Sequence, residues 1–105
     1  MLMHDKIEEF LNDEPWWVVD ESKAEFLNKE LKKELSPNHL LYGKKAVAVA
    51  SRFDCDDVVY WISELEKYAV VHLTWSKETS SQFPNTKLFT LSELEEHCKN
   101  VSKFY

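Results

Sequence analysis

The chain has 105 residues, of which 44% are hydrophobic and 13% aromatic, and it carries a net charge of −6. This length suits one domain, and the apolar content is too high for an intrinsically disordered chain. No apolar run approaches the roughly 20 residues that a transmembrane helix needs. The negative charge disfavours nucleic acids and anionic membranes, which proteins bind through Lys and Arg. We therefore expect one soluble domain over residues 1–105 and a basic protein partner, with neither nucleic acid nor membrane.

The N-terminal segment and the two cysteines bear on the compartment. The first residues carry charges and lack the apolar region of a secretory signal. Cys55 and Cys98 lie in different predicted elements without a C-x-x-C spacing, so the sequence indicates no disulfide framework. Two such thiols are expected to be reduced, with a redox pair as the alternative. A cytoplasmic location follows from these expectations.

The first half of the chain has helical periodicity. Residues 3–12 form a short amphipathic pattern that ends before Pro15, because a residue preceding proline is pushed out of the α region. Trp16–Val19 is an extended apolar segment. Ser22 and Glu25 have the spacing of a capping box and predict the start of a second helix. The apolar face of that helix has four residues at helical spacing: Ala24, Leu27, Leu31 and Leu35.

After residue 45 the period changes to two, which predicts strands. The strand pattern covers 46–50, 58–62, 68–75 and, briefly, 87–89. Short connections imply an antiparallel meander, and residues 76–86 form a polar loop. Thr90 and Glu93 then predict a capped C-terminal helix. The expected fold is α+β: N-terminal helices, a three- to four-stranded antiparallel meander and a C-terminal helix, with the helices on one face of the sheet. Because Tyr68–Trp75 is apolar on both sides, the alternatives are helices on both faces or one apolar face left for a partner.

Three segments of the chain have a familiar pattern: Pro37–Gly43 (PNHLLYG), Asp54–Val58 (DCDDV) and Tyr68–Trp75 (YAVVHLTW). The chain thereby resembles a group of small bacterial proteins with PNHPLYG, CDDVLF and YAVVHLTW segments. The resemblance spans roughly residues 36–92, and Leu40 stands where the group tends to have proline. The group has no established activity. The resemblance implies a bacterial origin and a compact domain, and it provides no catalytic residue.

The glycine content excludes several kinds of enzyme site. Gly43 is the single glycine, and a left-handed backbone is expected there. Phosphate-binding loops, dinucleotide fingerprints and esterase nucleophile elbows each need several glycines for close backbone approach. The sequence therefore predicts no such site and no cofactor.

The densest carboxylate cluster surrounds a predicted hairpin turn. Asp54, Asp56 and Asp57 favour a turn or a binding surface, with a divalent cation as the alternative. His72 lies in the neighbouring predicted strand, where Asp56 or Asp57 could reach it, and Cys55 is the nearest thiol. A hydrogen-bonded structural histidine is favoured over a Cys/His catalytic pair or a metal site.

Trp16 and Trp17 stand beside Asp13 and Glu14. Adjacent side chains on a strand point to opposite faces, so both indoles cannot enter one core. An exposed Trp among carboxylates is typical of a protein-binding hot spot. The other interpretation, in which Trp16 covers the core and Trp17 packs beneath a loop, is favoured over the hot spot.

These features favour a non-enzymatic, acidic protein-binding module. Its most concrete form is a bacterial immunity or antitoxin-like inhibitor of a basic, nuclease-type toxin. The expected contact residues are Asp13, Glu14, Trp16, Trp17, Asp54, Asp56 and Asp57. One alternative is a small metal-binding protein or hydrolase that uses the Asp-rich turn and His72. Another is a structural homo-oligomer, such as a homodimer formed through edge strands.

Overall fold

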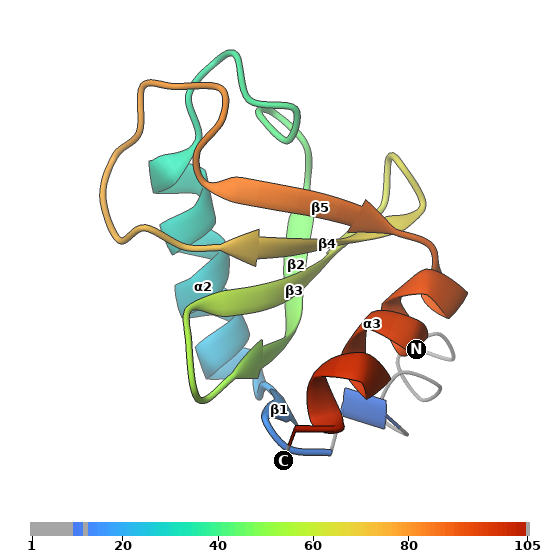
Figure 1. The fold of residues 1–105 in the computed structure, drawn as a ribbon. Helices are drawn as coiled ribbons and strands as arrows, with labels where there is room; N and C mark the ends of the chain where they lie inside the picture. Colours follow the sequence, from blue (N-terminus) through green and yellow to red (C-terminus); the bar gives the residue numbers. More distant parts are fainter. Residues whose placement is uncertain (1–9, 12, 105) are drawn as a thin grey trace.

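A computed structural model describes residues 10, 11 and 13–104 and confirms the α+β class. The elements in chain order are β1 (Trp16–Val18), α2 (Glu21–Glu34), β2 (Ala46–Arg52), β3 (Asp57–Ile62), β4 (Lys67–His72), β5 (Asn85–Phe89) and α3 (Leu91–Ser102). The strands form one antiparallel sheet in the order β1-β2-β3-β4-β5 (Figure 1). The predicted number of strands was too low, because the extended apolar segment at Trp16 pairs with β2 as a fifth strand.

The helix predicted over residues 3–12 lies outside the described residues except at its end. Phe10 and Leu11 have helical conformation, and both side chains are buried. They belong to the core on the α3 side of the sheet. Neither described helix combines the length and apolar character that a membrane crossing requires.

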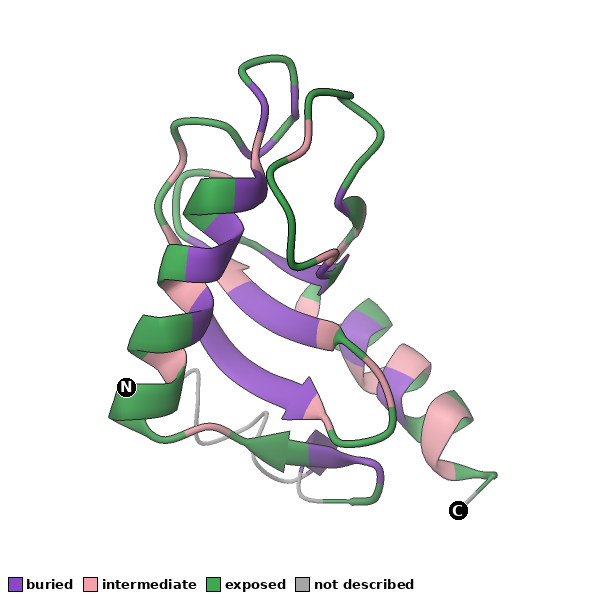
Figure 2. Cartoon of the chain, turned by 90° about the vertical axis from the view of Figure 1, so that its left-hand side faces the viewer, coloured by how far each residue is buried: buried purple, intermediate pink, exposed green. Residues whose placement is uncertain are grey.

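The two described helices cover opposite faces of the sheet (Figure 1). The α2-side core contains Leu27, Leu31, Leu41, Ala48, Val58, Tyr60, Ile62, Ala69, Val71 and Leu73. The α3-side core contains Phe10, Leu11, Trp16, Val49, Ala50, Val59, Tyr68, Val70, Leu94 and Cys98. The expectation that helices cover one face was therefore wrong. Strands β3 and β4 are buried over most of their length (Figure 2). Their apolar side chains belong to both cores, so each side of the sheet needs its own cover.

The predicted N-cap of α2 was wrong, whereas the predicted capping box of α3 is confirmed. Helix α2 begins after Asp20, whose side chain accepts a hydrogen bond of 2.8 Å from the Lys23 backbone N–H, so Ser22 is not its cap. Helix α3 has the predicted capping box. The Glu93 carboxylate accepts from the Thr90 backbone N–H at 2.8 Å, while the Thr90 hydroxyl accepts from the Glu93 N–H.

Strand β4 ends at His72, earlier than the pattern through residue 75 predicted. The backbone N–H groups of Thr74 and Trp75 donate to the buried Glu34 carboxylate, each at 2.8 Å, instead of continuing the sheet. Trp75 consequently has a left-handed backbone, with φ of 61°. Gly43 has the expected left-handed backbone as well, with φ of 78°.

Candidate functional site

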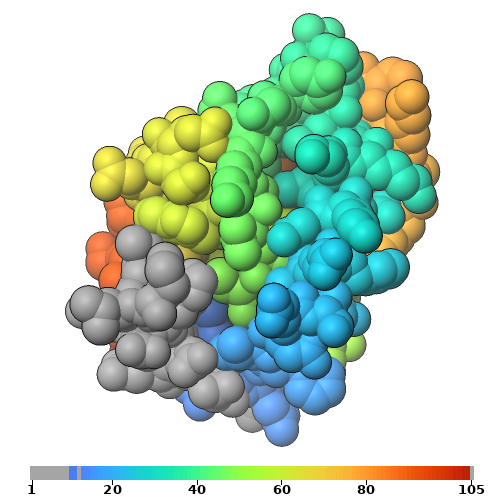
Figure 3. Space-filling model, turned by 180° about the vertical axis from the view of Figure 1, so that it is seen from behind, coloured from blue at the N-terminus to red at the C-terminus, as the bar shows by residue number. Residues whose placement is uncertain are grey.

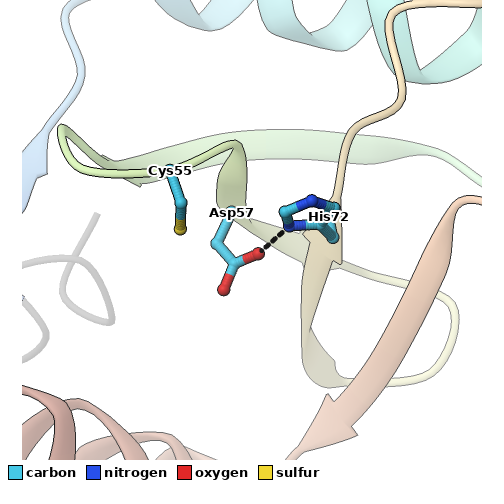
Figure 4. Close-up of side chains that lie close together, drawn as sticks. All are labelled: Cys55, Asp57 and His72. Atoms are coloured by element: carbon cyan, nitrogen blue, oxygen red, sulfur yellow. Dashed lines mark hydrogen bonds and ion pairs between the residues drawn. The ribbon is translucent and has the colours of Figure 1, made fainter.

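Three side chains of different chemistry meet at the β2–β3 turn (Figure 4). Asp57 begins β3 and His72 ends β4, and the antiparallel register pairs these two residues. The His72 Nδ1 lies 2.7 Å from the Asp57 Oδ1. Cys55 precedes Asp57 by two positions and turns its thiol to the same side. One sulfur, one oxygen and one nitrogen atom thus lie within 4.8 Å of one another, and we call these residues the Cys-Asp-His cluster.

Arg52 lies beside this cluster and is held by two carboxylates. Its Nε and Nη2 donate to Asp54 at 2.8 and 2.7 Å, a bidentate geometry. Its Nη1 lies 3.7 Å from the second oxygen of Asp57. Asp54 thereby pairs with the guanidinium group through both of its oxygens, and Asp57 keeps one oxygen directed at His72.

The surroundings of Cys55 argue against a role as a catalytic nucleophile. Burial raises the pKa of its thiol, and the Asp57 backbone N–H, which donates to the sulfur, offsets this only in part. A reactive cysteine needs a lowered pKa in an electropositive site. The cluster is therefore better suited to hold a ligand through its three donor atoms than to attack a substrate.

The two adjacent tryptophans point to opposite faces, as their alternation predicted. Trp16 is 2% exposed and lies in the α3-side core, where the Arg52 guanidinium is 5.5 Å from its ring centre. Trp17 is 59% exposed and contacts Phe53 edge-on, with ring centres 5.6 Å apart. Trp16 therefore covers the core, whereas Trp17 remains at the surface instead of packing beneath a loop.

A second exposed aromatic pair lies on the other side of the same turn. Trp75 stacks on Phe26 of α2, with ring centres 6.1 Å apart, and both side chains are about half exposed. The Trp75 indole N–H donates to the Asp56 carboxylate at 3.0 Å. Because Phe53 and Asp56 are three positions apart in one turn, that turn connects the two aromatic pairs.

Acidic residues border these aromatic side chains. The Phe53 backbone N–H donates to the Pro15 carbonyl at 3.0 Å, which brings the exposed Asp13 and Glu14 next to the turn. We call the resulting patch the aromatic–acidic surface: Asp13, Glu14, Trp17, Phe26, Phe53, Asp56 and Trp75. Of the other carboxylates predicted to bind a partner, Asp54 is engaged with Arg52, and Asp57 with both Arg52 and His72.

Sequence reasoning missed Phe26, Phe53 and Trp75 as surface residues. The signal at Phe26 was its position, since this large apolar residue lies off the face defined by Leu27 and Leu31. Trp75 gave no such signal, because it extended an apolar strand pattern.

A groove with a volume of about 810 Å³ separates α2 from the start of β2 (Figure 3). Four lysines line it, together with Leu31, Leu35 and Tyr42: Lys29, Lys32, Lys44 and Lys45. Lysines of α2 and lysines of the segment that precedes β2 therefore line one groove, which we call the basic groove. The basic groove and the aromatic–acidic surface have no residue in common.

Two other histidines have different surroundings from His72. His39 is 5% exposed; its Nδ1 accepts from the Leu41 N–H at 3.0 Å and its Nε2 lies 2.9 Å from the Pro84 carbonyl. The proton is thus on Nε2, and the ring joins the connector after α2 to the start of β5. His97 stacks on Phe89 in the α3-side packing, and burial lowers its pKa. Neither belongs to a group of metal-ligating side chains within the described part of the chain.

Comparison of the chain with protein-family models, with curated proteins and with solved structures finds no match.

Proposed function

We propose that this protein is a non-enzymatic binding module that contacts a basic protein through the aromatic–acidic surface. The observation that carries the proposal is the placement of two exposed aromatic pairs, Trp17–Phe53 and Trp75–Phe26, on either side of one acidic turn. Tryptophan is enriched at binding hot spots because a large rigid ring loses little conformational entropy when it is desolvated.

The negative charge of the aromatic–acidic surface bears on the charge of the partner. Asp13, Glu14 and Asp56 are exposed around the aromatic rings, on a chain whose net charge is −6. Carboxylates at the rim of an interface steer a positively charged protein toward it and reject a negatively charged one. A basic partner therefore fits this surface better than an acidic one.

The concrete form of the proposal is an immunity or antitoxin-like inhibitor of a basic, nuclease-type toxin. A nuclease cleft is positively charged because it binds phosphates. The acidic turn would occupy that cleft, while the aromatic rings would supply the desolvated contact area. Inhibition would then be steric and electrostatic, with no chemical step on this chain.

Affinity capture from a bacterial host that encodes the protein tests this proposal. The wild-type chain should retain a basic protein in stoichiometric amount and inhibit its nuclease activity. A Trp17→Ala/Trp75→Ala variant should lose capture and inhibition together, because both aromatic pairs lose their larger ring. Tyr42→Ala is the matched control: Tyr42 is 52% exposed but lies on the connector between α2 and β2, away from the β2–β3 turn (Figure 1).

The results separate the binding role from its concrete form. The captured protein could be basic but have no nuclease activity. If its capture required Trp17 and Trp75, the result would support the binding module and contradict the toxin-inhibitor form. Equal capture by the double variant and the wild type would contradict the surface. Failure of the wild type to retain any stoichiometric partner would contradict the proposal as a whole.

A further inference from the structure

We propose that Cys55, Asp57 and His72 form a binding site for a single divalent ion of the zinc type, with a fourth coordination position open to water. The site lies on the α3 side of the sheet, where β3 begins and β4 ends, and shares no residue with the aromatic–acidic surface, so it is an addition to the binding function proposed above. The donor set is the first argument. Thiolate sulfur, imidazole nitrogen and carboxylate oxygen are the three ligand types that proteins use for zinc, whereas calcium and magnesium require oxygen ligands throughout.

The backbone fixes two of the three ligands in place. Asp57 and His72 are paired residues of neighbouring antiparallel strands, so their side chains leave the sheet on the same side. Their ligand atoms are already 2.7 Å apart. The Asp57 side chain is 19% exposed and that of His72 is 54% exposed, so an ion could reach both from solvent.

Cys55 completes the site from a more adaptable position. It lies in the turn between β2 and β3, two residues before Asp57, and is partly buried. The three donor atoms lie within 4.8 Å of one another. Around a tetrahedral zinc ion, donor atoms are about 3.3–3.7 Å apart. To reach these distances, the Asp57 and His72 ligand atoms would move apart from 2.7 Å by side-chain rotation, and the turn would bring the Cys55 thiol closer, with no change in the strand pairing.

The charges near the site favour a divalent cation once Arg52 is taken into account. The guanidinium group lies nearest to the cluster, but its bidentate pairing with Asp54 balances its charge. The Cys55 thiolate and the Asp57 carboxylate then contribute two negative charges, which match one divalent ion.

Three donors with an open fourth position describe a zinc site that can exchange its last ligand. The Cys-Asp-His cluster is at the surface, so the fourth position faces solvent and can accept water or a small ligand. A structural zinc site would need a fourth side chain, and within residues 10, 11 and 13–104 the cluster contains three. The protein should therefore fold without metal, in contrast to a small zinc domain that is unfolded without its ion.

Titration of the chelator-treated full-length protein with Zn²⁺, against a chromophoric chelator, is the direct test. We expect one equivalent to bind, and Co²⁺ in its place should give the visible and near-ultraviolet absorption of a thiolate-ligated tetrahedral ion. Cys55→Ser and His72→Ala should each weaken binding at least about tenfold, and Cys55→Ser should abolish the thiolate absorption. Asp56→Asn is the matched control, since it removes a charge from the same turn without removing a ligand.

Each other result contradicts the proposal. Binding of Zn²⁺ that persists in a Cys55→Ser/His72→Ala double variant would assign the ion to another place. Equal weakening by Asp56→Asn would show that general negative charge attracts the ion. Absence of stoichiometric binding to the wild type would leave Asp57 and His72 as a structural pair. Far-ultraviolet circular dichroism verifies that each variant is folded, and partner capture is measured separately, so failure of one proposal does not imply failure of the other.

Discussion

Glu34 ends α2 with a carboxyl group that is completely buried. One oxygen accepts from the N–H and the hydroxyl of Thr74, and the other accepts from the N–H of Trp75. Burial, together with a hydrogen bond to Glu30, raises its pKa from 4.5 to about 7, although the backbone donors act in the opposite direction. This single side chain therefore holds the chain after β4 against α2 and keeps its proton to a higher pH than an ordinary carboxyl group does.

The raised pKa of Glu34 makes stability depend on pH in a defined window. The unfolded chain releases the proton near pH 4.5, whereas the folded chain keeps it up to about pH 7. The contribution of Glu34 to the free energy of unfolding is therefore complete below pH 4.5 and is lost as the pH rises to 7. We expect the free energy of unfolding to fall by on the order of 2 kcal/mol across this window.

Urea denaturation at a series of pH values measures this effect. Glu34→Gln removes the titrating group while keeping a side chain of similar shape, so its free energy of unfolding should depend less on pH between 4.5 and 7. Histidines and other carboxylates titrate in both proteins, and the difference between the two curves isolates Glu34. Parallel curves would show that Glu34 does not carry the raised pKa.

At the residue scale, sequence reasoning could place the side chains of the turn but not their contacts. Alternation showed that Trp16 and Trp17 face opposite ways, but only the pairing of β1 with β2 shows which indole enters the core. The prediction named Asp56 or Asp57 as a neighbour of His72. The choice of Asp57 depends on a register that the turn length sets. Contacts between distant segments, such as Trp75 with Phe26, leave no local pattern.

At the scale of the element, two residues near the start of α2, Asp20 and Ser22, are both of a type that can cap a helix. The sequence pattern favoured Ser22, but the Asp20 side chain accepts the Lys23 N–H. The chain leaves β1 only two residues before Asp20, and this geometry decides where the first turn begins. Local propensity cannot resolve a choice that tertiary structure makes. At α3 the sequence also offers two residues with this spacing, Thr90 before Glu93 and Ser92 before Glu95, and the predicted Thr90 is the cap in the structure.

Paired substitutions test the cap of α2. Asp20→Ala should lower the free energy of unfolding by about 1 kcal/mol, the usual cost of removing an N-cap side chain. Ser22→Ala should change it by less than about 0.5 kcal/mol, as is usual at an exposed position without such a role. Thermal or urea denaturation of both variants provides the comparison. A larger loss for Ser22→Ala than for Asp20→Ala would restore the capping box of the sequence prediction.

At the scale of the whole molecule, two cores share one sheet. Leu31 packs on one face and Leu94 on the other, while β3 and β4 contribute alternate side chains to both. The period of two along these strands was visible in the sequence and identified most of the sheet. It did not assign a helix to each face, because a strand that is apolar on both sides fits either arrangement.

Because the strands are shared, we expect the two cores to unfold together. Leu31→Ala and Leu94→Ala should each cost about 2–5 kcal/mol, the range for removing a buried leucine side chain. Each variant should still show one transition, with the same midpoint by tryptophan fluorescence and by circular dichroism. Separate midpoints, with one core lost before the other, would contradict a common cooperative unit.

The apolar character of both sheet faces has a consequence for how the strands find their partners. In an amphipathic sheet, a shift of one position exposes the apolar set to water and is thereby rejected. Here the same slip in β3 would only exchange the residues of the two cores, so the hydrophobic effect does not penalise it. Side-chain volumes and polar groups must instead distinguish the two registers, and Tyr60 and Asp57 supply polar contacts of this kind. The Tyr60 hydroxyl donates to the Leu27 carbonyl at 2.6 Å, and Asp57 meets His72 at the strand end. These two hydrogen bonds form only in the native register. They add little to the free energy of folding, but they favour the native strand pairing over one shifted by a single residue.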